Sequence, residues 1–129
     1  MSSWDDVRRL ALALPGTSEK ITGDGTAQWR VGTVLFVWER PLRTSDLAAL
    51  GDAAPTGPVL AARVPDVSAK EALLADGGSA LFSTPHFDGY PIVLAQLDLV
   101  DDALLEELVV EAWRCRAGKR LLAAFDDQA

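Results

Sequence analysis

The feature that most restricts the fold of this chain is a two-residue turn between two stretches with the composition of β-strands. Apolar and polar residues alternate over 27–31, which is the period of a strand with one buried face. Gly32-Thr33 then fits a hairpin turn with glycine first, and residues 34–40 return as a strand that is apolar on both faces through Trp38. Because so short a connection cannot make a parallel crossover, the sheet is predicted to be antiparallel, with the return strand inside it.

Periodicity, caps and helix breakers predict the other elements. Before and after the hairpin they are an amphipathic helix from Trp4 to Leu14 capped by Ser3 with Asp6 and ended by Pro15-Gly16, a polar loop over 17–26, one or two helical turns over 45–50, and an exposed connection over 51–58. Further on they are a strand over 59–64, a helix opened by Ser68 with Glu71 and closed by Gly77-Gly78, strands over 80–84 and 92–97, a long helix from Asp101-Asp102 to Gly118, and a last short helix around Leu121, Leu122 and Phe125.

This order, α-β-β-β-α-β-β-α, predicts an α+β fold. We expect a two-layer α/β sandwich, in which helices cover one face of an antiparallel five-stranded sheet. A chain of 129 residues has the size of one domain, so we expect a single domain over 1–129. The tryptophans all fall on faces predicted to be buried, namely Trp4, Trp29, Trp38 and Trp113.

Composition excludes several classes of protein. The longest apolar runs, such as 34–38, have the length of a strand, so we expect no membrane span and a cytoplasmic location. Cys115 is the only cysteine, which excludes an internal disulfide and a cysteine-based zinc cluster, and an inert thiol is the favoured interpretation. The glycines form no phosphate-binding fingerprint. We therefore expect no metal and no cofactor.

The stretch 81–94 is the first candidate site, since its two prolines and Asp88-Gly89 predict a rigid loop between two strands. This loop carries the only histidine, His86, and the only tyrosine, Tyr90. With Asp88 they could form an acid-base or ligand site, because imidazole titrates near neutral pH. No nucleophile motif or second histidine accompanies them, so a hydrogen-bonded structural histidine is the favoured alternative.

The second candidate is a group of basic residues in a chain whose net charge is −7. Acidic residues open the late helix and basic ones end it, an order that complements the helix dipole without any further role. The same bases could instead contact phosphate, together with bases around the first hairpin. The candidate nucleic-acid-binding residues are Arg30, Arg40, Arg43, Arg114, Arg116, Lys119 and Arg120.

Several motifs resemble those of the MmcQ/YjbR family of small bacterial proteins. They are AQWRV, a glycine turn, VLFVW and ERPLR, followed by FSTPHFDGYPIVL and EAWRCRAGKRL, and the opening helix ending in LPG also fits. The resemblance covers nearly the whole chain and implies a CyaY-like fold. It also implies DNA binding by a double wing, here the hairpin at Gly32-Thr33 and the loop 85–91, with the late bases on phosphates. Members often carry lysine in the first turn, where this chain has Gly32-Thr33-Val34.

These observations lead to a non-enzymatic binding module, with DNA as the expected partner. The alternative is a chaperone-like domain that binds a protein or peptide through the sheet face or the His86 loop. An enzyme that uses His86 and Asp88 on a small molecule is a third hypothesis. Salt dependence separates the first two, because phosphate contacts weaken steeply with ionic strength and an apolar interface does not.

Overall fold

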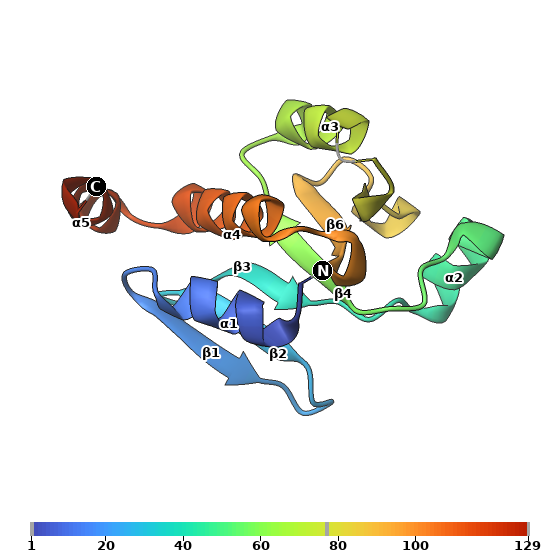
Figure 1. Cartoon of the computed structure of the whole chain (residues 1–129), viewed down its shortest axis with the longest axis horizontal. Helices are drawn as coiled ribbons and strands as arrows, with labels where there is room; N and C mark the ends of the chain where they lie inside the picture. Colours follow the sequence, from blue (N-terminus) through green and yellow to red (C-terminus); the bar gives the residue numbers. More distant parts are fainter. Residues whose placement is uncertain (1, 77, 129) are drawn as a thin grey trace.

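A computed structural model describes residues 2–76 and 78–128 of the chain, and it forms one antiparallel sheet with helices packed on it (Figure 1). The strands are β1 Thr17–Ile21, β2 Ala27–Val31, β3 Val34–Glu39, β4 Val59–Arg63, β5 Leu81–Phe82 and β6 Ile92–Gln96. The sheet has six strands in the order β1-β2-β3-β4-β6-β5, and every pair is antiparallel. The α+β fold and the antiparallel sheet are confirmed, and β3 lies inside the sheet as predicted.

The prediction of five strands is wrong by one, because β1 occupies the start of the stretch predicted to be a polar loop. β1 is an edge strand that pairs with β2 alone, so its sequence, TSEKI, needs no run of apolar residues. Its one inward acid, Glu19, lies opposite Trp29 and accepts a hydrogen bond from the indole Nε1 at 2.9 Å. Pairing with a neighbouring strand, and not local periodicity, makes this segment a strand.

Three helices pack against one face of the sheet, α1 Trp4–Leu12, α3 Val67–Asp76 and α4 Asp102–Arg116, and the last helix, α5 Lys119–Gln128, packs against the end of α4 through Phe125 on Trp113. The capping box of Ser3 and Asp6 opens α1 as predicted, and Asp101 caps α4 through the backbone N–H of Leu104 at 2.8 Å. The predicted capping box of α3 is wrong, because Asp66 accepts from the N–H of Ala69 at 2.8 Å. At the end of α3, Gly77 lies outside the described residues.

A β-bulge decides which side chains of β3 face the helices. Trp29 pairs with Val37 and Arg30 pairs with Leu35, so Phe36 is an extra residue with no opposite partner. Phe36 and Val37 are therefore both buried in the core under the helices. The bulge turns Trp38 to the opposite face of the sheet, where it pairs with Gln28 and Ala61.

The tryptophans are consequently buried to different degrees. Trp29 and Trp113 are fully buried, as predicted, and the Trp113 Nε1 donates to the carbonyl of Pro15 at 3.0 Å. Trp4 and Trp38 are only half-buried, so the prediction of burial holds for them in part. Trp4 stacks on Trp29 with ring centroids 6.3 Å apart, whereas Trp38 lies on the other side of the sheet.

The opposite face of the sheet is covered over β4 and β6 only. A second apolar cluster there consists of Val59, Ala61, Leu94 and Phe87, and Phe87 comes from the 3-10 turn Pro85–Phe87 that folds back over the strands. The short helix α2 Thr44–Leu50, at the predicted helical turns, lies beside that turn (Figure 1). In the described part of the chain no helix packs on this face over β1 and β2.

Candidate functional site

The uncovered part of the sheet, which we call the open face, is the side of β1–β3 turned away from α1 and α4. Its side chains, assigned by strand register, are Ser18, Lys20, Gln28, Arg30, Leu35 and Trp38. Glu19 points the other way, because it pairs with Trp29 in the core, and Glu39 lies at the end of β3, where its carboxylate accepts a hydrogen bond from the Ala27 N–H at 3.2 Å. The open face therefore presents two cations and an indole, with the carboxylate of Glu39 at its edge beside Trp38.

Arg30 is the one residue of the predicted basic set that lies on the open face. Its side chain is half-buried along the sheet, and its guanidinium donates to the side-chain oxygen of Gln28 at 2.9 Å. Lys20, on the adjacent edge strand, is exposed and pairs in register with Gln28. Lys20 was not singled out by sequence, because its strand was predicted to be a loop.

Arg40 and Arg43 lie at the end of β3, and the structure gives them different environments. Arg40 is 6% exposed, forms an ion pair with Asp46 of α2 at 3.1 Å, and stacks over the ring of Phe87. Arg43 is exposed, its backbone N–H donates to Asp46 at 2.9 Å, and among the described residues its guanidinium forms no ion pair. Arg40 therefore connects α2 to the Phe87 turn, whereas the guanidinium of Arg43 is accessible to a ligand.

Asp46 is the buried partner in that ion pair, and it was missed by sequence analysis. Burial disfavours its ionised form, but the N–H of Arg43 and the charge and hydrogen bond of Arg40 outweigh that cost and lower its pKa. Removing one member of a buried pair leaves the other without compensation. Arg40 and Asp46 are therefore structural residues at the border of the site.

The late bases lie apart from the open face, at the junction of α4 and α5. Arg114 forms an ion pair with Asp126 at 2.9 Å and stacks over Phe125, so it joins the two helices. Arg116, Lys119 and Arg120 are exposed. Because α4 packs on the helix-covered side of the sheet and α5 lies beyond the end of α4, the predicted basic set does not form one surface (Figure 1).

The two predicted wings are also differently placed. The Gly32-Thr33 turn exists, with Gly32 at a φ of 60°, and the Gly32 N–H donates to Gly16 beside α5. The 85–91 loop does not project from the sheet, because Phe87 anchors it in the second apolar cluster. These contacts give the second wing a role in covering the sheet.

The residues predicted for the loop site all point to solvent. His86, Asp88 and Tyr90 are exposed, and the imidazole of His86 packs edge to face on the ring of Phe87, with ring centroids 4.8 Å apart. In the described part of the chain no hydrogen bond joins His86 to Asp88. The nearby Ser83 hydroxyl donates to a backbone carbonyl at 3.4 Å, so the loop brings no nucleophile to the imidazole.

Lys70 of α3 holds this loop from below, and sequence analysis missed it. It is 5% exposed, and its Nζ donates to the carbonyl oxygens of Phe87 at 2.6 Å and Tyr90 at 3.1 Å. Burial lowers the pKa of Lys70, and the charge of Asp88 opposes that shift. Leu73 and Leu74 follow Lys70 by three and four residues, so helical spacing places the lysine on the apolar face of α3. That position was the signal in the sequence that Lys70 is buried.

Cys115 lines a cavity of about 320 Å³ with Arg63, Arg114 and Arg116. Burial and the charge of Glu111 raise the pKa of its thiol despite the neighbouring arginines. The thiolate is therefore disfavoured, which supports the interpretation of an inert thiol. Within residues 2–76 and 78–128 no group of His, Cys, Asp and Glu side chains is placed to hold a metal ion. In the same residues no helix has the length and apolarity to cross a membrane.

The fold has a counterpart among solved structures. The crystal structure of Deinococcus radiodurans protein DR2400, which carries a DUF419 domain, superposes with a TM-score of 0.62 over 88% of this chain and 77% of that one. At 21% identity this likeness concerns the fold, and it defines the class of protein as a small α+β domain of that architecture.

The chain belongs to the YjbR family, whose family model matches residues 12–115. Uncharacterised proteins of Mycobacterium bovis and Mycobacterium tuberculosis are 48% identical to it over 128 residues, covering 97% of this chain and 96% of theirs. The resemblance to the MmcQ/YjbR family that the loop and late-helix motifs carried is therefore confirmed.

Proposed function

We propose that this protein is a non-enzymatic nucleic-acid-binding module, with DNA as the expected partner, and that its contact surface is the open face. One observation carries the proposal. In a chain of net charge −7, the uncovered face of β1–β3 carries Lys20, Arg30 and a half-buried Trp38, while Glu19 faces the core and Glu39 lies only at the edge of this face. We further propose a cytoplasmic location, in keeping with a single cysteine.

A local cationic surface can attract phosphate even when the whole molecule is acidic, because charges beyond about 8 Å are screened at physiological ionic strength. Arg30 and Lys20 lie on adjacent strands as diagonal neighbours, because Lys20 is opposite Gln28 and Arg30 is opposite Ser18, which places them about 7 to 8 Å apart. Arg43 extends the cationic surface past the end of β3. An aromatic side chain between these cations supplies a platform for a base.

This surface differs from the double wing expected from the family resemblance. The open face replaces the late bases as the proposed contact, because Arg114 is paired with Asp126 and the others lie at the junction of α4 and α5, apart from the open face. The Gly32-Thr33 turn borders the open face and can take part as an edge. The Gly32-Thr33 turn carries no cation, which agrees with a nucleic-acid contact centred on the strands and not on the turn.

The test is a titration of labelled duplex and single-stranded DNA at several salt concentrations. Wild type is compared with a Lys20→Gln/Arg30→Gln double variant. If both cations meet phosphate, the double variant binds more weakly whatever the base sequence, and the salt slope falls in magnitude by roughly two. Its melting temperature must be measured alongside, because the Nε of Arg30 is buried.

The matched control is Lys119→Gln/Arg120→Gln, which removes the same charge from exposed positions on α5. We expect this control to bind as wild type does. Equal loss in both double variants would show attraction to overall charge, and loss in the control alone would move the site to the late bases. Absence of binding at low salt would refute nucleic-acid binding.

A second candidate, peptide binding, has its own observation. A groove of about 210 Å³ between α3 and α4 has an apolar floor that includes Val64, Leu73 and Leu108, with Glu107 and Glu111 at its border. Such a groove fits a short amphipathic helix that carries basic residues beside its apolar ones. We infer that a basic amphipathic peptide is the partner if this second function operates.

A labelled Leu/Lys amphipathic peptide tests that candidate by fluorescence anisotropy. Leu73→Glu should abolish binding, because it places a charge on the apolar floor. Binding through the groove should depend less on salt than binding to DNA does. An unchanged affinity in Leu73→Glu would refute the groove as the peptide site.

A further inference from the structure

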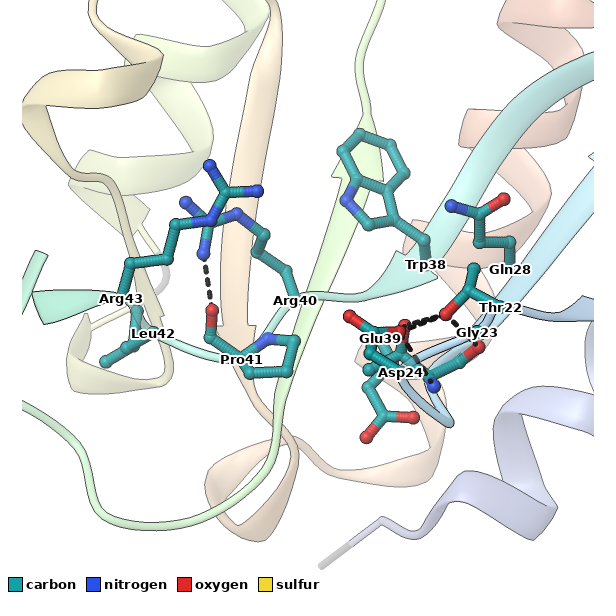
Figure 2. A pocket seen from close by; sticks show the side chains of 11 residues that line it. Thr22, Gly23, Asp24, Gln28, Trp38, Glu39, Arg40, Pro41, Leu42 and Arg43 are labelled. Carbon is teal, nitrogen blue, oxygen red and sulfur yellow. Dashed lines mark hydrogen bonds between the residues drawn. The ribbon is translucent and has the colours of Figure 1, made fainter.

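A cavity of about 550 Å³ lies at the edge of the open face, between the end of β3 and the Thr22–Thr26 turn (Figure 2). Trp38 and Gln28 project into it from neighbouring strands, and Arg43 lies on its α2 side. The carboxylates of Asp24 and Glu39 also line it. The cavity thus combines an indole, an amide, a guanidinium and two carboxylates. Which of these groups already form hydrogen bonds or ion pairs within the protein decides what ligand can bind there.

The indole of Trp38 is held from one side by the protein and presents another side to the cavity. It packs against the second apolar cluster through its cross-strand neighbour Ala61 and is half-buried. A tryptophan fixed in this way loses little conformational entropy on binding a planar ring. Stacking of a base on an aromatic side chain tolerates any sequence, because every base has a π-face.

The side-chain amide of Gln28 uses its oxygen in a hydrogen bond within the protein, whereas its NH₂ group is available to a ligand. Its side-chain oxygen accepts from the guanidinium of Arg30 at 2.9 Å, so the amide orientation is fixed. The amide NH₂ makes no hydrogen bond within the described residues, and it is a donor. The acceptors on base edges, carbonyl oxygens and ring nitrogens, match such a donor.

The acids of the cavity argue against a phosphate inside it. Asp24 accepts from the hydroxyls of Thr22 and Thr26, the latter at 2.9 Å, and these hydrogen bonds lower its pKa. Glu39 accepts from the N–H of Ala27 at 3.2 Å. Two carboxylates at the cavity wall repel an anion, but they do not repel a neutral polar ring. Arg40 offers no free charge, because it is paired with Asp46.

A base can enter this concave site only when it has left the stack. In a duplex the bases lie inside the helix and their faces are covered by neighbouring bases, so an indole in a cavity cannot reach them without base flipping. In a single strand the bases can splay out and stack on aromatic side chains. The geometry therefore favours a single strand.

Building on the proposed function, we propose that this cavity is a subsite for one unstacked base of single-stranded nucleic acid. The base stacks on Trp38, its edge accepts from the amide of Gln28, and the adjoining phosphate lies outside the cavity against Arg43. The strand then continues across the open face towards Arg30 and Lys20.

The experiment measures the affinities of an oligo-dT single strand and of a duplex of equal length at low salt. Trp38→Leu should weaken the single strand about fivefold to 150-fold, which is the loss of one stacked base, and should leave the duplex within twofold. Trp38→Phe should restore much of the affinity. Arg43→Gln should lower the salt slope for the single strand by about 0.7, with Arg120→Gln as the matched control.

A second variant guards against loss of folding in Trp38→Leu. Gly23 borders the cavity, and a side chain there would begin in open space with an ordinary φ, so Gly23→Met fills the cavity without removing a contact. Gly118→Met, remote from the cavity and equally unobstructed, is its control. Gly23→Met should weaken the single strand, whereas Gly118→Met should not.

The outcomes separate this inference from the proposed function. Equal single-strand affinity in wild type, Trp38→Leu and Gly23→Met would overturn the base subsite, even if the Lys20→Gln/Arg30→Gln variant still loses binding. Equal weakening of single strand and duplex in Trp38→Leu would also overturn it. Absence of binding to either nucleic acid at low salt would overturn both proposals.

Discussion

At the scale of single residues, the ion pair of Arg40 and Asp46 has the clearest energetic consequence. Both side chains are almost fully buried, at 7% and 2% exposure. Replacing Asp46 by Asn leaves the Arg40 charge buried without its partner, so we expect a loss of about 3 to 5 kcal/mol in the free energy of unfolding. Urea denaturation at neutral pH measures this loss, and the exposed Asp52→Asn is the control.

The same pair predicts a pH dependence with a definite sign. The pKa of Asp46 in the folded protein is below its ordinary value of 3.8, so the folded state binds the proton less tightly than the unfolded state does. Its contribution to stability is complete above about 3.8 and is lost as pH falls through the lowered value. The stability gap between wild type and Asp46→Asn should narrow over that acid range. A constant gap would contradict this.

Gly89 is the residue whose backbone the turn constrains most directly. An Asp-Gly pair is common in turns that need a positive φ at the glycine, and the structure has 79° at Gly89. We expect Gly89→Ala to lose about 1 kcal/mol and Gly89→Val more, because a Cβ is strained in this region. Gly23→Ala, at an ordinary φ and with no atom near the added Cβ, should change the melting temperature little.

At the scale of elements, Lys70 connects α3 to the 85–91 loop. Lys70→Met keeps the length of the side chain but leaves the carbonyl oxygens of Phe87 and Tyr90 without their donor. We expect a loss of about 1 to 3 kcal/mol, concentrated in this loop. Hydrogen exchange should show faster opening over 85–91, with protection in β2 and β3 retained. Uniformly faster exchange throughout the sheet would contradict a local role.

The packing of α4 on the sheet depends on Trp113. Its ring is fully buried, contacts Phe125 of α5 and donates to Pro15 beyond α1, so one side chain joins three segments. Trp113→Ala should cost about 3 to 5 kcal/mol. Trp4→Ala, at a half-buried ring, should cost clearly less in the same urea titration. Similar losses in the free energy of unfolding for both variants would show that burial of the ring does not determine the loss.

At the scale of the whole molecule, charge opposes the function that the open face supports. The net charge of −7 opposes the approach of DNA, while the few cations of the open face attract phosphate most strongly at low salt. We therefore expect weak binding by wild type at physiological salt and measurable binding at low salt. Tight binding at physiological salt that is lost in Lys20→Gln/Arg30→Gln would show that the local surface outweighs the net charge.

Local sequence was sufficient for features that depend on neighbours along the chain. The hairpin at Gly32-Thr33, the Ser3 cap, the positive φ at Gly89 and the break of the late helix before Lys119 follow from side-chain chemistry within a few residues. Alternation over 27–31 likewise placed Trp29 in the core and Arg30 on the other face. From these the antiparallel α+β fold could be predicted.

Only the tertiary structure decided the site. Strand β1 forms because it pairs with the edge of β2, and the bulge at Phe36 turns Trp38 out of the core. Both features depend on pairing between separate segments of the chain. Lys70 is buried because carbonyls 17 and 20 residues away accept from it, and Asp46 is buried because the chain turns after β3 and brings the Arg40 guanidinium against it. Bases close in sequence, such as Arg40 and Arg43, received different roles for the same reason. Periodicity reports which residues are buried, whereas three-dimensional contacts decide which polar groups remain free to bind.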